Sequence, residues 1–159
     1  MPLHAALAPN DDQLLEELLS FLTRAPSTLD IVLQRKFGLT HFEYRVLSLL
    51  AEAPGRRLRM ATITDRTGGS KSRLSHVLSK LERAQWVQRL TVPGCRGVYA
   101  FLTQPGYDKV CPAHSWYGHT VRELLLAPMN PSQREDLSAL VTSWSSRLDQ
   151  QAAMTFARD

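Results

Sequence analysis

The stretch that decides the fold reads GGSKSRLSHVLSKLERAQWVQRLTVPGCRGVYAFLTQ and covers residues 68–104. Its first half places apolar residues at positions i, i+3, i+4 and i+7, which is the spacing of one helix face. Two glycines break the chain before this segment, and Ser70 suits the N-cap position. The sequence therefore predicts a helix over 70–83. Its apolar face consists of Leu74, Val77, Leu78 and Leu81.

The opposite face of this helix is small, polar and basic, with no acid before Glu82. A helix N-terminus attracts anions, because its unpaired N–H groups and its dipole are both positive. Serine, histidine and arginine side chains on an exposed helix can also hydrogen-bond to phosphates and base edges. We therefore expect this face to bind DNA. The outward-facing residues are Ser72, Ser75, His76, Ser79 and Arg83, and the first turn adds Ser70, Lys71 and Arg73.

The second half of the stretch predicts a β-hairpin. Residues 86–92 and 97–103 are rich in β-branched and aromatic residues, and Pro93-Gly94-Cys95-Arg96-Gly97 between them is typical of a turn. A short helix over 60–67 precedes the 70–83 helix and makes it the second helix of a helix-turn-helix. Together these elements predict a winged helix-turn-helix core over 40–104, with Arg96 at the wing tip for a backbone or minor-groove contact.

Charge is distributed unevenly along the 159-residue chain. Residues 56–100 hold ten Lys or Arg and two acids, whereas the remainder holds nine basic and thirteen acidic residues. A basic central segment flanked by acidic segments is typical of a nucleic-acid-binding surface carried by a dimerising or regulatory protein. The alternative is an ordinary solvated basic face.

Amphipathic helices are predicted on both sides of this core. The segment 11–38 has a helical apolar stripe with an expected kink or break at Pro26, and Thr40-His41-Phe42-Glu43 is a capping box that opens the next helix. The segment 107–155 is interrupted by Pro112 and resumes at Asn130-Pro131, an N-cap followed by an N1 proline. We therefore predict a mostly α fold with a small β-wing, whose terminal helices form a two-fold dimer interface. The alternative is an intramolecular helix bundle.

The order of these elements resembles the MarR family of bacterial regulators, and one combined motif supports the resemblance. The motif is Leu-Glu-x-x-x-Trp-Val-x-Arg at 81–89, followed by a wing and by Leu-Thr-x-x-Gly at 102–106. The resemblance covers nearly the whole chain. It implies one MarR-type domain over 1–159 that forms a homodimer and binds a pseudo-palindromic double-stranded DNA operator, usually as a repressor released by a small aromatic ligand.

The resemblance also implies which residues contact DNA. They are Ser70, Lys71, Ser72, Arg73, Ser75 and His76 on the helix, and Arg96 on the wing. Two positions depart from the family pattern. Gly94 stands where an acid commonly steadies the wing arginine, in a wing that is a few residues short, and His76 stands where arginine is frequent. Phosphate affinity at His76 is therefore expected to vary with pH.

A ligand pocket is expected at the junction between the flanking helices and the DNA-binding core, where aromatic and polar side chains collect. The alternative for each of these residues is ordinary packing. The candidates are His41, Tyr44, Arg45, Trp116 and His119.

Other classes of function have weaker support in the sequence. His114 and His119 are five residues apart and face different sides of a helix, so their spacing does not favour a metal site. Cys95 beside Arg96 is a candidate redox sensor with Cys111 as its resolving partner. We find no nucleophile elbow, phosphate loop or cofactor motif, and expect no enzyme activity. A winged helix that binds proteins rather than DNA is a further alternative. Without a signal segment or a membrane-spanning run, we expect a cytoplasmic protein.

Overall fold

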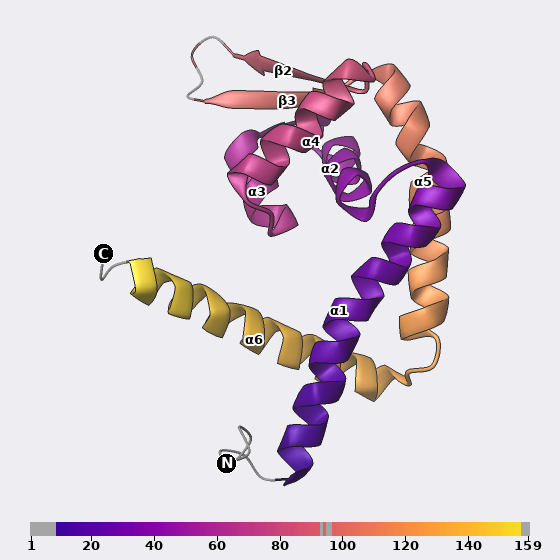
Figure 1. Ribbon diagram of the computed structural model, residues 1–159, viewed down its shortest axis with the longest axis vertical. Helices are drawn as coiled ribbons and strands as arrows, with labels where there is room; N and C mark the ends of the chain where they lie inside the picture. Colours follow the sequence, from indigo (N-terminus) through magenta and orange to yellow (C-terminus); the bar gives the residue numbers. More distant parts are fainter. Residues whose placement is uncertain (1–8, 93, 95–96, 157–159) are drawn as a thin grey trace. The chain divides into compact units, whose positions relative to one another are not determined.

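Helix α1 (Pro9–Phe37) is the first element of the computed structural model, which describes residues 9–92, 94 and 97–156. Helix α1 is one continuous element (Figure 1) that includes Pro26, so the predicted break at this proline is wrong, whereas the alternative, a kink, stays a prediction. Proline removes one backbone N–H, and a helix of 29 residues keeps its other hydrogen bonds on both sides. The helix ends before Gly38, whose φ of 64° is the left-handed conformation that glycine adopts without strain.

Helix α2 (His41–Glu52) begins at the predicted capping box. The Thr40 hydroxyl accepts the Glu43 N–H at 3.2 Å, and the Glu43 carboxylate accepts the Thr40 N–H at 2.9 Å. A short turn, η1 (Pro54–Arg56), and strand β1 (Arg57–Arg59) follow. Strand β1 was not predicted, because three residues are too few to show a period.

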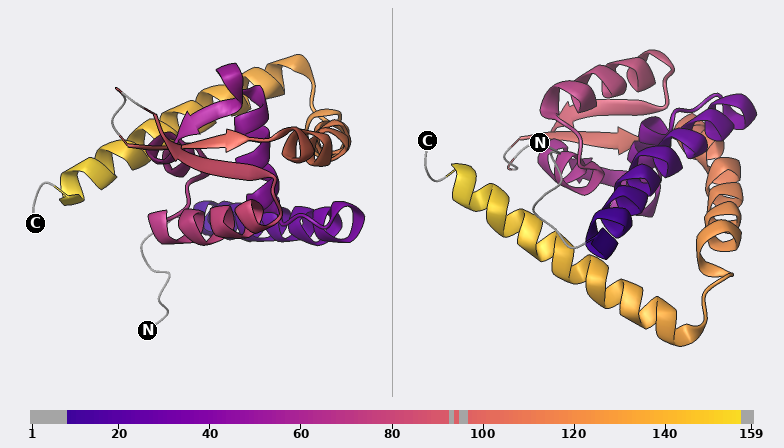
Figure 2. Two further views of the ribbon diagram at one scale, coloured as in Figure 1. Left: turned by 90° about the horizontal axis from the view of Figure 1, so that it is seen from above. Right: turned by 60° about the horizontal axis from the view of Figure 1, so that its bottom comes forward.

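The helix-turn-helix and its wing lie where the sequence predicts them. Helix α3 (Met60–Thr67) ends at Gly68, and α4 (Lys71–Arg83) follows with Ser70 as its N-cap. Strands β2 (Val87–Thr91) and β3 (Val98–Leu102) form an antiparallel hairpin beside α4 (Figures 1 and 2), and β1 pairs with the other edge of β3. The sheet order is therefore β1-β3-β2. A mostly α fold with a small β-wing is confirmed.

One hydrophobic core joins α2, α3 and α4 to the sheet. The predicted apolar face of α4 is buried, and the polar face lies outside. Burial of a Leu or Val side chain stabilises the fold by about 1.5 to 3 kcal/mol relative to exposure. This core fixes which face of α4 reaches solvent. Its largest fully buried side chains are Leu33, Leu39, Val46, Leu47, Leu50, Ile63, Leu74, Leu78, Leu81, Val87 and Val110.

Helix α5 (Gln104–Val121) continues through Pro112, so the helix does not start at this proline; the other expectation, a bend there, stays a prediction. The chain divides into two units, Met1–His114 and Ser115–Asp159. The second unit contains the π-helical turn η2 (Arg122–Leu126) and helix α6 (Pro131–Phe156). The predicted cap of α6 is confirmed, since the Asn130 side chain accepts the Gln133 N–H at 2.9 Å and the Gln133 side chain accepts the Asn130 N–H at 2.9 Å. Among the described residues, no helix is long and apolar enough to cross a membrane.

Candidate nucleic-acid interface

The outward face of α4 is formed as the sequence predicts. The Ser70 hydroxyl accepts the Arg73 N–H at 3.1 Å and thereby caps the helix. Because the apolar side of the helix is buried, the polar side chains are held on the surface at fixed helical spacing. The exposed residues of this face are Ser70, Lys71, Ser72, Arg73, Ser75, His76 and Arg83, and Ser79 is half-buried.

A cluster at the end of α4 fixes the wing to the helix. The backbone N–H of Arg89 on β2 donates to Glu82 Oε1 at 2.9 Å. The Nε atom of the same arginine donates to Glu82 Oε2, also at 2.9 Å. The Arg89 Nη2 atom also donates to Ser79 Oγ at 3.0 Å. The Ser79 hydroxyl, predicted to contact DNA, thus binds a residue of the wing in this structure. Sequence reasoning missed the pair, whose members are seven residues apart on different elements.

The Glu82–Arg89 pair makes stability depend on pH. Hydrogen bonds from Arg89 lower the pKa of the Glu82 carboxyl below its ordinary value of 4.5. A lowered pKa stabilises the folded state above about pH 4.5, and this contribution is lost as the pH falls through the lowered value. We expect Glu82→Gln to lose about 1 kcal/mol of unfolding free energy at pH 7. Urea unfolding of both proteins should show this difference shrinking below pH 4.5. A difference that does not change with pH would contradict the assignment.

A second ion pair holds α4 to α2. Lys80 Nζ lies 2.6 Å from Glu43 Oε1, and the Glu43 side chain is only 3% exposed. The same carboxylate caps α2 through Thr40. One buried acid therefore sets both where α2 begins and how α4 packs against it. The capping role follows from the local Thr-x-x-Glu pattern, whereas the Lys80 contact depends on the tertiary fold.

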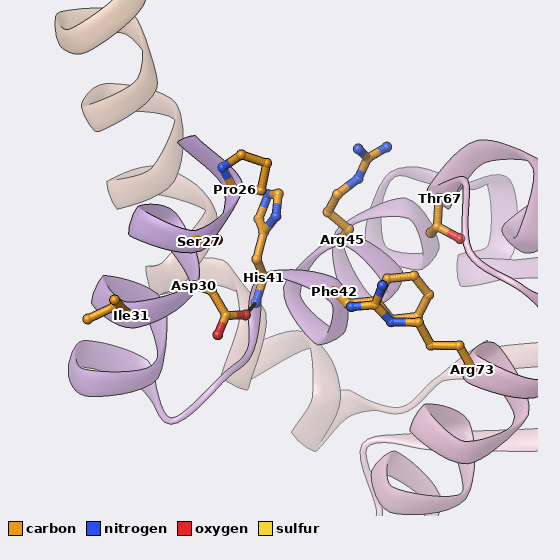
Figure 3. Close-up of a pocket in the computed structure, with 9 residues that line it drawn as sticks. All are labelled: Pro26, Ser27, Asp30, Ile31, His41, Phe42, Arg45, Thr67 and Arg73. Carbon is orange, nitrogen blue, oxygen red and sulfur yellow. Dashed lines mark hydrogen bonds between the residues drawn. The ribbon is translucent and has the colours of Figure 1, made fainter. Parts of the chain in front are cut away.

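The side chain of Arg73 makes a contact that the helical spacing of the sequence does not predict. Its guanidinium carbon lies 4.3 Å from the centroid of the Phe42 ring, a cation–π distance. The Phe42 ring also packs against the backbone at Gly69, where an added Cβ would lie 2.7 Å from the ring. Figure 3 shows the Arg73 side chain extending from the start of α4 to this ring. In this conformation the guanidinium is turned toward α2.

Arg73 also lines a cavity of about 580 Å³ in the first unit. The cavity lies between the second half of α1, the N-terminal turns of α2 and the helix-turn-helix (Figure 3). It combines two guanidinium groups with one carboxylate, hydroxyls and an aromatic ring. The lining residues are Pro26, Ser27, Asp30, Ile31, His41, Phe42, Arg45, Thr67 and Arg73.

The cavity includes two of the five predicted ligand residues, His41 and Arg45. Tyr44 is buried, and its hydroxyl forms a hydrogen bond of 3.3 Å with the His114 Nδ1 atom on α5 instead of lining the cavity. Trp116 and His119 belong to the second unit, so their part in a pocket stays a prediction. Sequence reasoning missed the contribution of α1 to the cavity. Ser27 and Asp30 are polar residues on an amphipathic helix, and from the sequence such residues indicate only a solvent-exposed face.

Burial lowers the pKa of the His41 imidazole, and the nearby cations of Arg45 and Arg73 lower it further, against an opposing effect of Asp30. The imidazole is therefore uncharged near pH 7. The Asp30 carboxylate accepts the backbone N–H of His41 at 2.7 Å. Arg45 Nη2 donates to the Arg66 carbonyl oxygen at 2.7 Å, which ties α2 to the end of α3.

Of three further residues predicted to have a role, the structure describes only one. Arg96 and Cys95 lie outside the described residues, so the wing-tip contact and the thiol sensor stay predictions. Cys111 is half-buried on α5. Its hydrogen bond with Tyr107 raises the pKa of that phenol. Among the residues that the structure describes, no three His, Cys, Asp or Glu side chains gather as a metal site would require.

Known proteins share this fold and this sequence pattern. A sequence model described as MarR family matches residues 37–94. Sco3205, a MarR family transcriptional regulator from Streptomyces coelicolor crystallised in complex with DNA, is 31% identical over 89% of this chain and 93% of its own, with a TM-score of 0.84. AbsC, a MarR family transcriptional regulator from the same organism, is 28% identical over 91% and 97%, with a TM-score of 0.85.

MepR from S. aureus, in a crystal structure with DNA, has the same fold at 18% identity, with a TM-score of 0.71 over 83% of this chain and 96% of its own. No curated protein sequence matches the chain significantly. The match to Sco3205, which extends over nearly the whole length of both chains, combines with the family sequence model and the winged helix-turn-helix described above. The chain therefore belongs to the MarR family of transcriptional regulators.

Proposed function

We propose that this protein is a DNA-binding repressor that acts as a homodimer on a pseudo-palindromic operator and is released by a small aromatic ligand. The observation that carries the proposal is the exposed face of α4, which presents serines, a histidine and basic groups around a capped helix N-terminus. Such a face neutralises phosphates and reaches base edges in the major groove. The 31% identical Sco3205, crystallised with DNA, supports the same function.

The apolar surfaces of the terminal helices support the homodimer. Helices α1 and α6 each carry large side chains that are 40% or more exposed. Exposed apolar stripes of this length on soluble proteins mark protein–protein contacts. A two-fold dimer covers them with identical surfaces and sets two α4 helices at a fixed spacing. These side chains are Leu14, Leu15, Leu19, Phe21, Leu22 and Ile31 on α1 and Leu137, Leu140, Val141, Trp144, Leu148 and Met154 on α6.

The cavity beside Phe42 supports control by a ligand. Its volume of about 580 Å³ suits a small organic molecule, and its wall includes Arg73 of α4 and Thr67 at the end of α3. A molecule bound there touches the DNA-binding helix directly. Repression follows if the operator overlaps a promoter, since the bound dimer then excludes polymerase.

The Lys71→Ala variant tests the DNA-binding face. We expect weaker binding to DNA from the region flanking the protein's own gene. Each lost phosphate contact makes the slope of log K against log salt concentration shallower by about 1. A dimer loses one contact per subunit, so its slope should become shallower by about 2. Fluorescence anisotropy at several salt concentrations measures both quantities. Lys36→Ala, an exposed lysine in the last turn of α1, is the matched control and should leave the slope unchanged. An unchanged slope in Lys71→Ala would contradict the proposed face.

A further inference from the structure

The three-stranded sheet has an inner face toward α4 and an outer face on the opposite side. Arg89 marks the inner face, because its guanidinium pairs with Glu82 on α4, and its strand partner Ala100 is fully buried. Successive side chains of a strand point to opposite faces, so the neighbours of these two residues lie on the outer face. The register arranges the outer face in two rows. The rows are Arg57, Phe101 and Gln88, and Arg59, Tyr99 and Leu90.

The outer face of the sheet places cations beside aromatic rings. Its two arginines are exposed, and its two rings, on the central strand β3, are half-buried. Side chains directly opposite each other on antiparallel strands have Cβ atoms about 5 Å apart, so each ring has an arginine next to it. One of these pairs is in direct contact. The Arg59 Nε atom donates to the Tyr99 hydroxyl at 2.7 Å, and its guanidinium carbon lies 5.6 Å from the centroid of that ring.

The charge on the outer face is entirely positive. The strand residues, 57–59, 87–91 and 98–102, include three arginines and no Asp or Glu. Of these arginines, Arg89 is paired with Glu82 on the inner face. The outer face therefore carries the two charges of Arg57 and Arg59 without an acid of the sheet to balance them. A partner with complementary charge is an anion.

The two rings favour a single strand of nucleic acid over other anionic polymers. Tyr99 and Phe101 are two residues apart on one strand, and thus about 7 Å apart along it. Each ring can stack on one unpaired base while the arginines beside the rings pair with phosphates. Some RNA-binding domains hold bases in this way, on aromatic rings at the surface of an antiparallel sheet. The bases of a duplex are stacked on each other, so they have no free face for a ring.

We propose that the outer face of the sheet binds single-stranded nucleic acid, with bases on Tyr99 and Phe101 and phosphates on Arg57 and Arg59. This inference adds a second nucleic-acid surface and does not rest on the DNA binding proposed for α4. Because α4 contacts the inner face of the sheet through the Arg89 cluster, the two surfaces lie on opposite sides. A duplex on α4 and a single strand on the sheet can therefore bind at the same time.

The probes are fluorescein-labelled oligothymidylate and oligouridylate of about ten nucleotides, within the usual size of single-strand sites. We expect the double variant Arg57→Gln and Arg59→Gln to bind the preferred probe about tenfold more weakly. Its slope of log K against log salt concentration should be shallower by about 1.4, since each lost contact with a single strand removes about 0.7. Fluorescence anisotropy measures both quantities. The probe that binds more tightly shows whether the ligand is DNA or RNA.

The Phe101→Leu variant tests stacking separately from charge. Leucine keeps an apolar side chain but has no ring, so binding of the probe should weaken by about tenfold. The salt slope should not change, because no cation is lost. Thermal unfolding of each variant measures whether it is folded, and the exposed arginine pair provides the test if Phe101→Leu is not.

The matched control is the double variant Lys71→Gln and Arg83→Gln, which removes two exposed charges from α4 instead of the sheet. It should weaken binding of duplex DNA and leave binding of the oligonucleotide nearly unchanged, whereas the Arg57 and Arg59 variant should do the reverse. Equal losses of oligonucleotide binding in the two double variants, or full affinity in a folded Phe101→Leu, would overturn the inference. Polyglutamate that competes as well as unlabelled oligonucleotide would also overturn it, in favour of an acidic protein. None of these results would affect duplex binding by α4.

Discussion

Gly106→Ala is expected to destabilise the protein by about 3 kcal/mol, at the upper end of what overpacking a core costs. Gly106 lies in the first turn of α5, and an added Cβ would be 2.1 Å from the carbonyl oxygen of Trp86. That oxygen is held in place because it accepts the Thr103 N–H at 3.0 Å. Backbone atoms cannot move aside as a flexible side chain does. Thermal and urea unfolding measure the loss.

Gly118→Ala is the matched control, because Gly118 belongs to the same helix and nothing described lies within 4 Å of an added Cβ. Replacing an exposed helical glycine by alanine stabilises a helix by up to about 1 kcal/mol. The two variants should therefore change the free energy of unfolding in opposite directions. Equal effects would contradict the close approach of α5 to Trp86.

Trp144→Glu is expected to convert the proposed homodimer into monomers. Trp144 is 41% exposed at the centre of the apolar stripe of α6, and a buried carboxylate at an interface has no partner. Multi-angle light scattering should report a mass near 17.9 kDa in place of twice that value. Operator affinity should fall by about a hundredfold or more, because two linked half-site contacts become one.

Ser146→Glu adds the same charge about 200° away on the same helix, outside the apolar stripe. It should leave the mass and the DNA affinity unchanged. A dimer that survives Trp144→Glu, or one that Ser146→Glu disrupts equally, would show that this stripe is not the interface.

Features set by neighbouring residues could be predicted from the sequence. The capping box at Thr40, the N-cap at Asn130, the apolar face of α4 and the hairpin all depend on residues within a few positions of each other. In each of these patterns the residues that cause the structure lie next to each other in the sequence. A side-chain oxygen accepts a nearby backbone N–H, or the spacing of apolar residues matches the period of a helix. The exposed positions on α4 followed from the same period.

Features set by distant residues could not be predicted. Strand β1 exists because Leu58 pairs with Ala100 on β3, 42 positions away in the chain. The helices continue through Pro26 and Pro112, where local rules favour an interruption. Arg73 was assigned to DNA from its place near the helix start, and its contact with Phe42 depends on how α4 packs against α2. The cavity, which needs three segments of the chain, has the same origin.

Footprinting of the full-length protein on DNA flanking its own gene tests the central claim most directly. The claim is that two α4 helices of a homodimer read one face of the DNA. It predicts two protected segments centred about 10 base pairs apart, which is one helical turn. A Ser75→Ala and His76→Ala double variant should lose the sequence-specific protection and keep the salt-dependent background binding. A single protected segment, or protection unaffected by these substitutions, would contradict the account.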